Sequence, residues 1–309
     1  MNGIIIIDKP SGKTSHDVVS DVKKILAVKK AGHTGTLDPL ATGILAVCIN
    51  EGTKLAQFFA DDSKEYLATM LLGVETDTLD TDGKIVAERQ INVDEHAIRQ
   101  SVNGMVGKIK QRPPQYSALK FQGKPLYKWA RMGCDINVEP RAVEIFRVNV
   151  EEIHLPYVTF TVSCSKGTYV RSICSDIGES LGCGACLAGL RRTRTGGFSD
   201  QSALSLEHID DKEKQRVAAQ HIIPLMDMLP EFAAIDIAPS LSEKIRSGRQ
   251  PTVGDLQTYQ IPFLDAGGMV KFTANGCLIA VGKMLFSTDE IGLLQNERPA
   301  VKILRVINN

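Results

Sequence analysis

The apolar runs of this 309-residue chain are short, and their length limits what it can fold into. Residues 4–7 and 44–49 have the length of buried β-strands, whereas a membrane-spanning helix needs about 18 or more consecutive apolar residues. The first run ends at Asp8 and no basic stretch precedes it, so we do not expect a secretory signal. The sequence therefore predicts a soluble, cytoplasmic protein built around buried strands.

Strands and helices follow one another without strict alternation. Periodicity predicts helices at residues 15–28, 54–59, 94–106, 126–131, 169–181 and 210–220, and strands at 4–7, 43–49, 66–72, 143–153 and 158–163. This order is typical of an α+β domain rather than a doubly wound one.

A domain boundary is predicted near residue 230, where Pro224 and Pro230 follow a charged helix. Beyond it, short apolar segments at residues 270–273 and 278–284 are joined across Asn275-Gly276, a strong hairpin signal. We therefore expect two domains, residues 1–230 and a small β-rich domain over residues 231–309.

Positive charge gathers in one part of the chain, although 36 basic and 36 acidic side chains cancel overall. Residues 105–131 contain no Asp or Glu, while most charges in residues 75–95 are acidic. The first segment combines basic and aromatic side chains: Lys108, Lys110, Arg112, Lys120, Lys124, Lys128 and Arg131, with Tyr116, Phe121, Tyr127 and Trp129 among them. This mixture suits binding to phosphates and unpaired bases. A solvated basic face with its aromatics turned to the core fits the composition equally well.

Two short motifs invite interpretations that the sequence does not support. Gly12-Lys13-Thr14 suggests a phosphate-binding loop, but that motif needs a glycine five residues before Gly12, where the chain has Ile7. Cys183 and Cys186 have the spacing of a metal or redox pair, but no second close pair completes a zinc site. With seven cysteines, an odd number, we expect reduced thiols rather than disulfides.

The densest chemical signal is the segment over residues 32–43, where glycines, threonines and a proline surround Asp38. Turn-forming residues fix the backbone there and aim the carboxylate. An aspartate placed in this way serves as a nucleophile, a base or a helix cap, and the segment alone does not choose among them.

This segment, GHTGTLDPLATGIL, resembles the catalytic signature of the TruB-type tRNA pseudouridine synthases. Further segments match in order and approximate spacing over about the first 200 residues: DKPSGKTSHDVV, TKLAQFFADDSKEY, PPQYSALKFQGKPLYKWAR, CSKGTYVRSICSDIGESLGCGA and LRRTRTGGF. The resemblance implies an α+β pseudouridine synthase catalytic domain with a mixed central sheet. It also implies an RNA-gripping insertion at about residues 105–150 and a small PUA-like RNA-binding domain at the C-terminus.

The resemblance also assigns roles to individual residues. Asp38 matches the family's catalytic aspartate, and Arg171 matches the arginine that pairs with it. The remaining matches are substrate-binding: His33, which fills the place of the extruded nucleotide, Tyr66, which stacks on the target uracil, Tyr169 and Leu190 of the base pocket, and, more weakly, Lys54 near the cleft.

The activity implied is conversion of uridine 55 in the tRNA T loop to pseudouridine by a monomer. No metal, nucleotide or other cofactor is expected, because the reaction only moves the glycosidic bond from N1 to C5 of the same base. Two alternatives stay open: a guide-dependent synthase of the dyskerin type, which shares the loop around Asp38, and an RNA-binding tRNA folding factor with secondary or lost catalysis. No membrane partner is expected.

Overall fold

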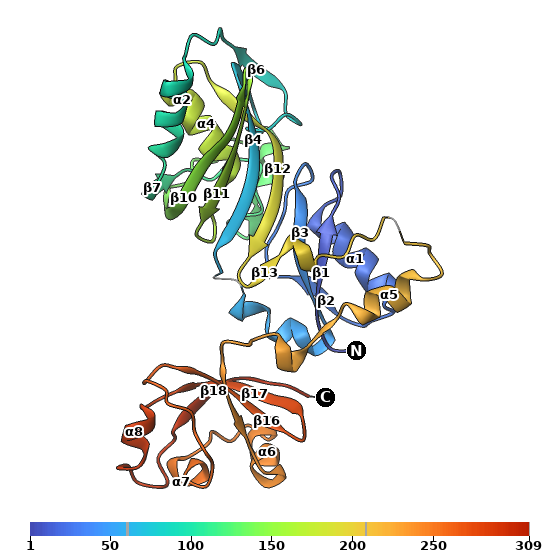
Figure 1. The fold of residues 1–309 in the computed structure, drawn as a ribbon, viewed down its shortest axis with the longest axis vertical. Coiled ribbons are helices and arrows are strands. Elements are labelled where there is room, and N and C mark those ends of the chain that lie inside the picture. Colours follow the sequence, from blue (N-terminus) through green and yellow to red (C-terminus); the bar gives the residue numbers. More distant parts are fainter. Residues whose placement is uncertain (60–61, 208, 309) are drawn as a thin grey trace.

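The computed structural model describes residues 1–59, 62–207 and 209–308 and is dominated by one large mixed sheet (Figure 1). The order of its main strands is β14-β1-β3-β12-β4-β11-β10-β7, with β2 added beside β3 and β13 beside β12. In chain order these are β1 (Gly3–Lys9), β2 (Ala31–His33), β3 (Thr42–Ile49), β4 (Lys64–Leu72), β7 (Gly107–Gln111), β10 (Arg141–His154), β11 (Tyr157–Cys164), β12 (Ala185–Thr195), β13 (Phe198–Ser199) and β14 (Ile223–Pro224). The predicted α+β class is confirmed.

Helices cover the two halves of the sheet separately. Helix α1 (Ser15–Ile25) packs its valines against β1 and β3, and α5 (Lys214–Gln220) joins the same core. Helices α2 (Glu95–Asn103) and α4 (Val170–Ser180) cover β4, β10, β11 and β12. A small hairpin, β5 (Val74–Thr76) and β6 (Ile85–Glu88), flanks this half.

The two halves meet at β12, a central strand that our sequence analysis did not predict. It pairs antiparallel with β4 along most of its length, but parallel with β3 at only two positions, Arg191 with Thr42 and Arg192 with Gly43. The second half of the strand is rich in arginine and threonine, so it lacks the apolar pattern that marks a buried strand. Arg192 is nevertheless only 2% exposed.

Several predicted helices differ from the structure, among them the helix predicted over residues 94–106, which ends at Asn103. Residues 54–59 form part of two short 3₁₀ turns, η1 (Asn50–Lys54) and η2 (Ala56–Phe58), rather than an α-helix. Helix α1 ends at Ile25 because Ala27 adopts a left-handed backbone conformation with φ +51°. Helix α5 begins at Lys214, four residues later than predicted.

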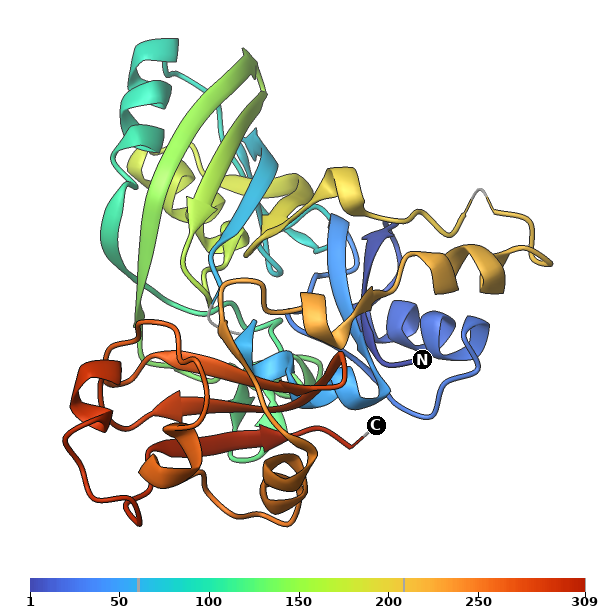
Figure 2. The same ribbon diagram turned by 60° about the horizontal axis from the view of Figure 1, so that its bottom comes forward.

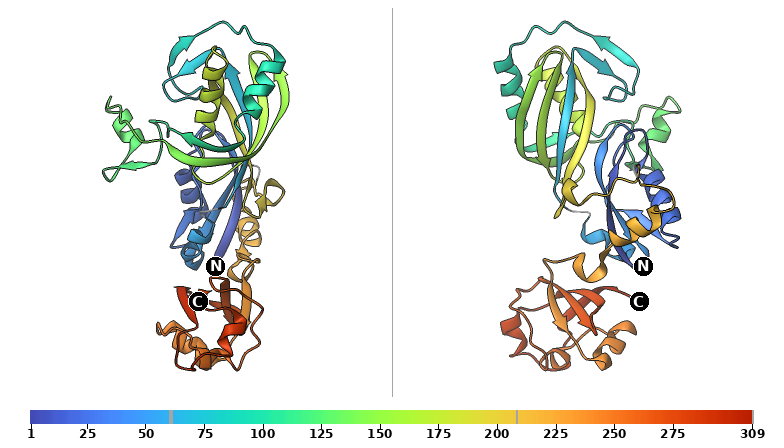
Figure 3. Two further views of the ribbon diagram at one scale, coloured as in Figure 1. Left: turned by 90° about the vertical axis from the view of Figure 1, so that its left-hand side faces the viewer. Right: turned by 45° about the vertical axis from the view of Figure 1, so that its right-hand side comes forward.

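Residues 112–140 leave the main sheet and project from the rest of the molecule (Figure 3). They contain a two-stranded hairpin, β8 (Lys120–Phe121) and β9 (Lys124–Pro125), followed by α3 (Leu126–Ala130). The segment is held together by its own aromatic and basic side chains. Trp129 packs edge-on against Phe121, and the Nζ of Lys124 lies 4.6 Å from the centre of the Trp129 ring. Phe121, Tyr127 and Trp129 are half-buried in the projecting segment, and a second basic group, Arg131, stacks on Tyr127.

Residues from 233 onward form a second sheet with its own core (Figure 2). Its strands are β15 (Ala233–Asp236), β16 (Met269–Ala274), β17 (Cys277–Met284) and β18 (Val301–Val306), and its helices are α6 (Pro239–Arg246), α7 (Val253–Leu256) and α8 (Thr288–Ile291). The hairpin predicted across Asn275-Gly276 is confirmed, and both residues have positive φ, as a tight hairpin turn requires.

None of the helices in the described ranges is long and apolar enough to cross a membrane.

Gly43, at the junction of the two halves, has no room for a side chain. Its φ is +93°, and a Cβ would lie 2.3 Å from the Arg192 carbonyl oxygen. We therefore expect Gly43→Ala to lower the free energy of unfolding by about 2–4 kcal/mol, measured by denaturant titration. Gly32→Ala is the control, because a Cβ there meets nothing within 4 Å. Equal stability of both variants would show that this junction tolerates a side chain.

Candidate active site

The loop carrying Asp38 lies between β2 and β3 and is fastened to the segment that follows β1. Ser15 Oγ donates to the Leu37 carbonyl and accepts from the Leu37 amide, at 3.0 and 2.8 Å. The Gly12 amide donates to the Pro39 carbonyl at 2.9 Å. The Gly12-Lys13-Thr14 motif therefore supports the Asp38 loop and caps α1, since Thr14 accepts a hydrogen bond from the Asp17 amide.

Lys9, the last residue of β1, is fully buried beneath the same loop. Its ammonium donates to the carbonyls of Pro10, Lys13 and Pro39, at 2.8, 2.7 and 3.2 Å. Burial lowers the pKa of Lys9 to about 8, although the nearby Asp38 charge opposes this shift. The buried Lys9 ammonium thus joins the turn after β1, which contains Pro10 and Lys13, to Pro39 of the Asp38 loop.

Arg171, on the first turn of α4, holds the Asp38 carboxylate. Its Nη2 lies 2.9 Å from Asp38 Oδ2, and its Nη1 lies 3.5 Å from Asp80 Oδ2. The same two nitrogens also donate to the carbonyls of Tyr116 and Thr78, each at 2.9 Å. The Arg171 side chain is 4% exposed and the Asp38 side chain 37%, so the carboxylate reaches the solvent while its partner does not.

Arg192, on β12, fixes the loop from a second side. Its Nε donates to the Ile44 carbonyl at 2.8 Å and its Nη2 to the Gly35 carbonyl at 3.1 Å. A guanidinium buried in this way must satisfy its donors within the protein, and here it uses backbone carbonyls of the Asp38 loop and of β3.

A cavity of about 240 Å³ opens above Asp38. Five of the residues predicted from the sequence line it together: Asp38, Tyr66, Tyr169, Arg171 and Leu190. Other lining residues were not predicted and include Lys64, Ser117, Lys166 and Arg192. Tyr66 is 8% exposed, and burial raises its pKa, partly opposed by the Arg192 charge. The cavity therefore combines one carboxylate, aromatic and apolar walls and several cations.

The structure places the other two predicted residues outside the lining of this cavity. His33 ends β2, opposite Val47 of β3, and is followed by Thr34, which does line the cavity. Burial lowers the pKa of His33. Lys54 lies on η1, where its Nζ donates to the Val306 carbonyl of β18 at 3.0 Å and pairs with Glu51 at 2.8 Å. Lys54 thus links the main sheet to the C-terminal sheet.

Lys9 and Arg192 are the main site residues that our sequence analysis missed as supports of the loop. For Lys9 one signal could have revealed this role: it is a basic residue at the end of a strand that is otherwise almost entirely buried and apolar. Arg192 gave no such signal, because the second half of β12 has no apolar pattern. Three buried side-chain polar atoms in the described residues lack a hydrogen-bond partner in the protein, namely His33 Nδ1, Ser117 Oγ and Arg171 Nε. Such atoms are costly and rare in folded proteins, and these three belong to the cavity wall or its border.

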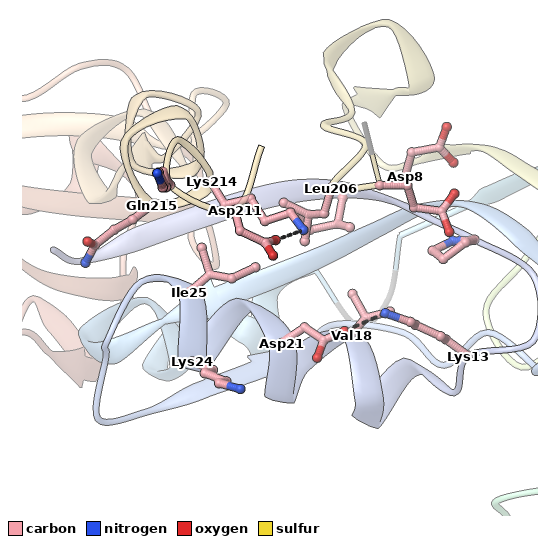
Figure 4. A pocket seen from close by; sticks show the side chains of 14 residues that line it. Asp8, Lys13, Val18, Asp21, Lys24, Ile25, Leu206, Asp211, Lys214 and Gln215 are labelled. Atoms are coloured by element: carbon pink, nitrogen blue, oxygen red, sulfur yellow. Dashed lines mark hydrogen bonds and ion pairs between the residues drawn. The ribbon is translucent and has the colours of Figure 1, made fainter. Parts of the chain in front are cut away.

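A larger cavity, of about 560 Å³, lies between α1 and α5 (Figure 4). None of the residues predicted for the site lines it. Its charged groups largely pair within the protein, since Lys13 bonds to Asp21 and Lys214 to Asp211. It has no aromatic wall, and its arginine-bound carboxylate, Asp8, is held by Arg191, whose side chain is partly exposed rather than buried like that of Arg171.

This chain places a carboxylate held by a buried arginine in a cavity of an α+β fold, an arrangement typical of enzyme active sites. Two family models match it: "TruB family pseudouridylate synthase (N terminal domain)" over residues 23–170 and "tRNA pseudouridylate synthase B C-terminal domain" over residues 171–229. The chain belongs to the TruB family of pseudouridylate synthases. Residues 233–306, which hold the second sheet, lie beyond both matched ranges.

Relatives and solved structures agree with this family. A tRNA pseudouridine synthase B of Syntrophus aciditrophicus is 53% identical over 100% of this chain and 99% of its own length, and one of Geobacter sulfurreducens is 41% identical over 100% of both. A structure of an H/ACA RNP bound to a substrate RNA containing 2′-deoxyuridine is also similar, with a TM-score of 0.71 and 28% identity over 99% of this chain and 85% of that chain. A Cbf5-Nop10-Gar1 complex matches at a TM-score of 0.71 and 30% identity, covering 98% of this chain and 84% of that chain.

We expect the charge of Lys9 to control the activity at high pH. Loss of its proton, at a pKa of about 8, leaves two N–H donors for three carbonyl acceptors beneath the Asp38 loop. The rate of product formation should therefore fall above pH 8, and Lys9→Met should be slow at every pH, without this descending limb. A wild-type rate that stays constant to pH 9.5 would contradict this role.

The free energy of unfolding should change with pH in the opposite direction to the reaction rate. The folded-state pKa of Lys9 lies below its unfolded value of 10.5, so the unfolded chain binds this proton more tightly. Between pH 8 and pH 10.5 the free energy of unfolding of the wild type should rise relative to that of Lys9→Met, by up to about 3 kcal/mol. Denaturant titrations of both proteins across this range measure the difference.

Proposed function

We propose that this protein converts uridine 55 in the T loop of tRNA to pseudouridine, with Asp38 as the reacting carboxylate. The observation that carries the proposal is the ion pair between Asp38 and the buried Arg171 at the floor of the cavity. The pair fixes the direction of the carboxylate, as attack or proton removal at the target nucleotide requires.

The reaction balances within one nucleotide. The bond between N1 and the ribose breaks, the uracil turns, and a bond forms between C5 and the same ribose carbon. N1 gains a proton and C5 loses one, so no electrons and no further group enter the balance. The balance therefore requires no redox agent and no co-substrate, and we propose that the enzyme works without a metal, a nucleotide or another cofactor.

The walls of the cavity suit a base that has left its stack. Extrusion of a base costs a few kcal/mol. The ring of Tyr66 and the side chain of Leu190 offer flat and apolar contacts that offset this cost, and Tyr169 also lines the cavity. His33, next to the cavity-lining Thr34 in the chain, occupies the place that the extruded nucleotide leaves in the RNA.

Two further parts of the chain bind the RNA outside the cavity. The projecting residues 112–140 present cationic groups stacked on half-buried aromatics, a surface that suits the phosphates and exposed bases of the T arm. We assign residues 1–230 to the catalytic domain, with its RNA-gripping insertion at about residues 105–150, and residues 231–309 to a PUA-like RNA-binding domain. Lys54 supports binding by holding this second domain against the first.

The protein acts as a monomer in the cytoplasm. One chain supplies the cavity, the projecting segment and the second sheet, so a single RNA arm needs no second subunit. Each of the seven cysteines is a free thiol, which suits a reducing compartment.

A guide-dependent synthase is the second candidate, and the similarity to the H/ACA RNP and Cbf5 structures favours it. The projecting segment argues for the standalone enzyme, because it lets the chain hold RNA directly, without a guide. An RNA-folding factor without catalysis is the third candidate, and the intact Asp38–Arg171 pair argues against it.

The proposal predicts that Asp38→Asn abolishes product while leaving tRNA affinity within about threefold of wild type. Asparagine keeps the size of the side chain but loses the charge that attacks or accepts a proton. The assay incubates unmodified tRNA with purified protein, without guide RNA or cofactor, and maps pseudouridine by carbodiimide-dependent primer-extension stops.

A stop in the T loop with wild type alone is the expected result. Full product formation by Asp38→Asn would contradict the role of the carboxylate. Product that forms only after a guide RNA is added would favour the guide-dependent candidate, and tight tRNA binding without any product would favour the folding factor.

A further inference from the structure

The first turn of α4 is joined to the root of the projecting segment by a row of hydrogen bonds. Ser172 Oγ donates to the Arg112 carbonyl at 3.1 Å, and Arg171 Nη2 donates to the Tyr116 carbonyl at 2.9 Å. The side-chain amide of Gln111 binds the backbone of Tyr169. The first turn of α4 therefore contacts both the projecting segment, residues 112–140, and, through Arg171, the Asp38 carboxylate.

Gln111 makes the closest of these connections. It is the last residue of β7, directly before the chain leaves the sheet, and it is 2% exposed. Its Oε1 accepts from the Tyr169 amide at 2.7 Å, and its Nε2 donates to the Tyr169 carbonyl at 3.0 Å. The side-chain amide thus pairs with both backbone groups of one residue, as a neighbouring strand would.

The residue that Gln111 holds is the N-cap of α4. Tyr169 has an extended backbone, with φ −102° and ψ 110°, and its own side chain makes no capping hydrogen bond. Its carbonyl begins the helix by accepting from the Ile173 amide at 3.2 Å. The amide of Gln111 therefore fixes where α4 starts, and with it the directions of Tyr169 and, two residues later, Arg171.

We infer that Gln111 is a positioning residue. It holds the turn that carries Tyr169 and Arg171 in a fixed position relative to the projecting segment, residues 112–140. The inference rests on the proposed roles of those residues and of Asp38. The Gln111–Tyr169 contact then connects the segment that binds the RNA to the turn that positions the reactive carboxylate. Loss of Gln111 misplaces the Asp38–Arg171 pair relative to the bound nucleotide, so it slows the chemical step without loosening the RNA.

Gln115 provides a matched control within the same part of the chain. Its amide also makes two hydrogen bonds to one residue, accepting from the Ile136 amide at 3.2 Å and donating to the Ile136 carbonyl at 2.8 Å. Ile136 lies within the projecting segment, so this pair closes the neck of that segment and does not involve α4. The variants Gln111→Ala and Gln115→Ala therefore remove the same kind of double hydrogen bond at two different places.

The test measures two quantities for wild type, Gln111→Ala, Gln111→Glu and Gln115→Ala: the dissociation constant for unmodified tRNA, and the single-turnover rate of pseudouridine formation at saturating enzyme. For Gln111→Ala we expect the rate to fall about tenfold or more, with the dissociation constant within about threefold of wild type. Gln115→Ala should weaken tRNA binding, and its rate at saturating enzyme should fall by less than that of Gln111→Ala.

Gln111→Glu guards against a trivial loss of folding. Glutamate has the same shape and keeps the acceptor for the Tyr169 amide, but it replaces the Nε2 donor with an oxygen facing the Tyr169 carbonyl. It should lower the rate in the same direction, and near-UV circular dichroism checks that each variant is folded. If Gln111→Ala does not fold, the Glu variant decides the question.

The inference is overturned if the folded Gln111 variants keep the wild-type rate, or if they weaken tRNA binding without slowing the reaction. The proposed role of Asp38 is tested separately by Asp38→Asn. A wild type that forms no product would contradict the proposed function, whereas an active wild type with fully active Gln111 variants would contradict only the positioning role.

Discussion

The ion pair between Arg171 and Asp38 is the contact on which the rest of the site depends. A buried guanidinium is stable only when its charge is compensated, and the two terminal nitrogens of Arg171 bind two carboxylates and two carbonyls, while its Nε has no partner in the protein. Asp80 completes the group from the buried side, where burial raises its pKa. The Asp38 carboxylate therefore faces the cavity, while the buried Arg171 fixes its orientation from the interior of the protein. Removal of one member would leave an uncompensated buried charge, which is why these residues act as a unit.

The architecture of the sheet explains why the site lies where it does. Its two halves are joined by a parallel pairing of only two residue pairs between β3 and β12, and the Asp38 loop leads directly into β3. Lys9 comes from one half, Arg192 from the junction, and Arg171 from the helix that covers the other half. Three buried cations from three parts of the chain thus converge on one loop. A reactive group held in this way has little freedom to move, which reduces the reorganisation needed during the reaction.

The sequence predicted the elements whose pattern is local and missed those defined by distant partners. The strands at residues 4–7, 43–49 and 158–163 and the Asn275-Gly276 hairpin are marked by apolar runs or turn residues, and the structure contains them. Strand β12 was missed because its second half is rich in arginine and threonine, and Arg192 is buried there by partners from other elements, the Ile44 and Gly35 carbonyls. Asp38, Tyr66, Tyr169, Arg171 and Leu190 were named from the family resemblance, and the fold brings them to one cavity. Lys54 contacts the C-terminal sheet instead, a position that no local pattern reveals.

The most direct test of this central ion pair is chemical rescue of Arg171→Ala. The rate of pseudouridine formation in tRNA is measured for the folded variant with increasing concentrations of guanidinium ion below the denaturing range. The structure predicts a large loss of rate that free guanidinium partly and saturably restores, while Asp38→Asn gains nothing from the same ion. An Arg171→Ala protein that forms pseudouridine at the wild-type rate without guanidinium would contradict the dependence of the carboxylate on this buried arginine.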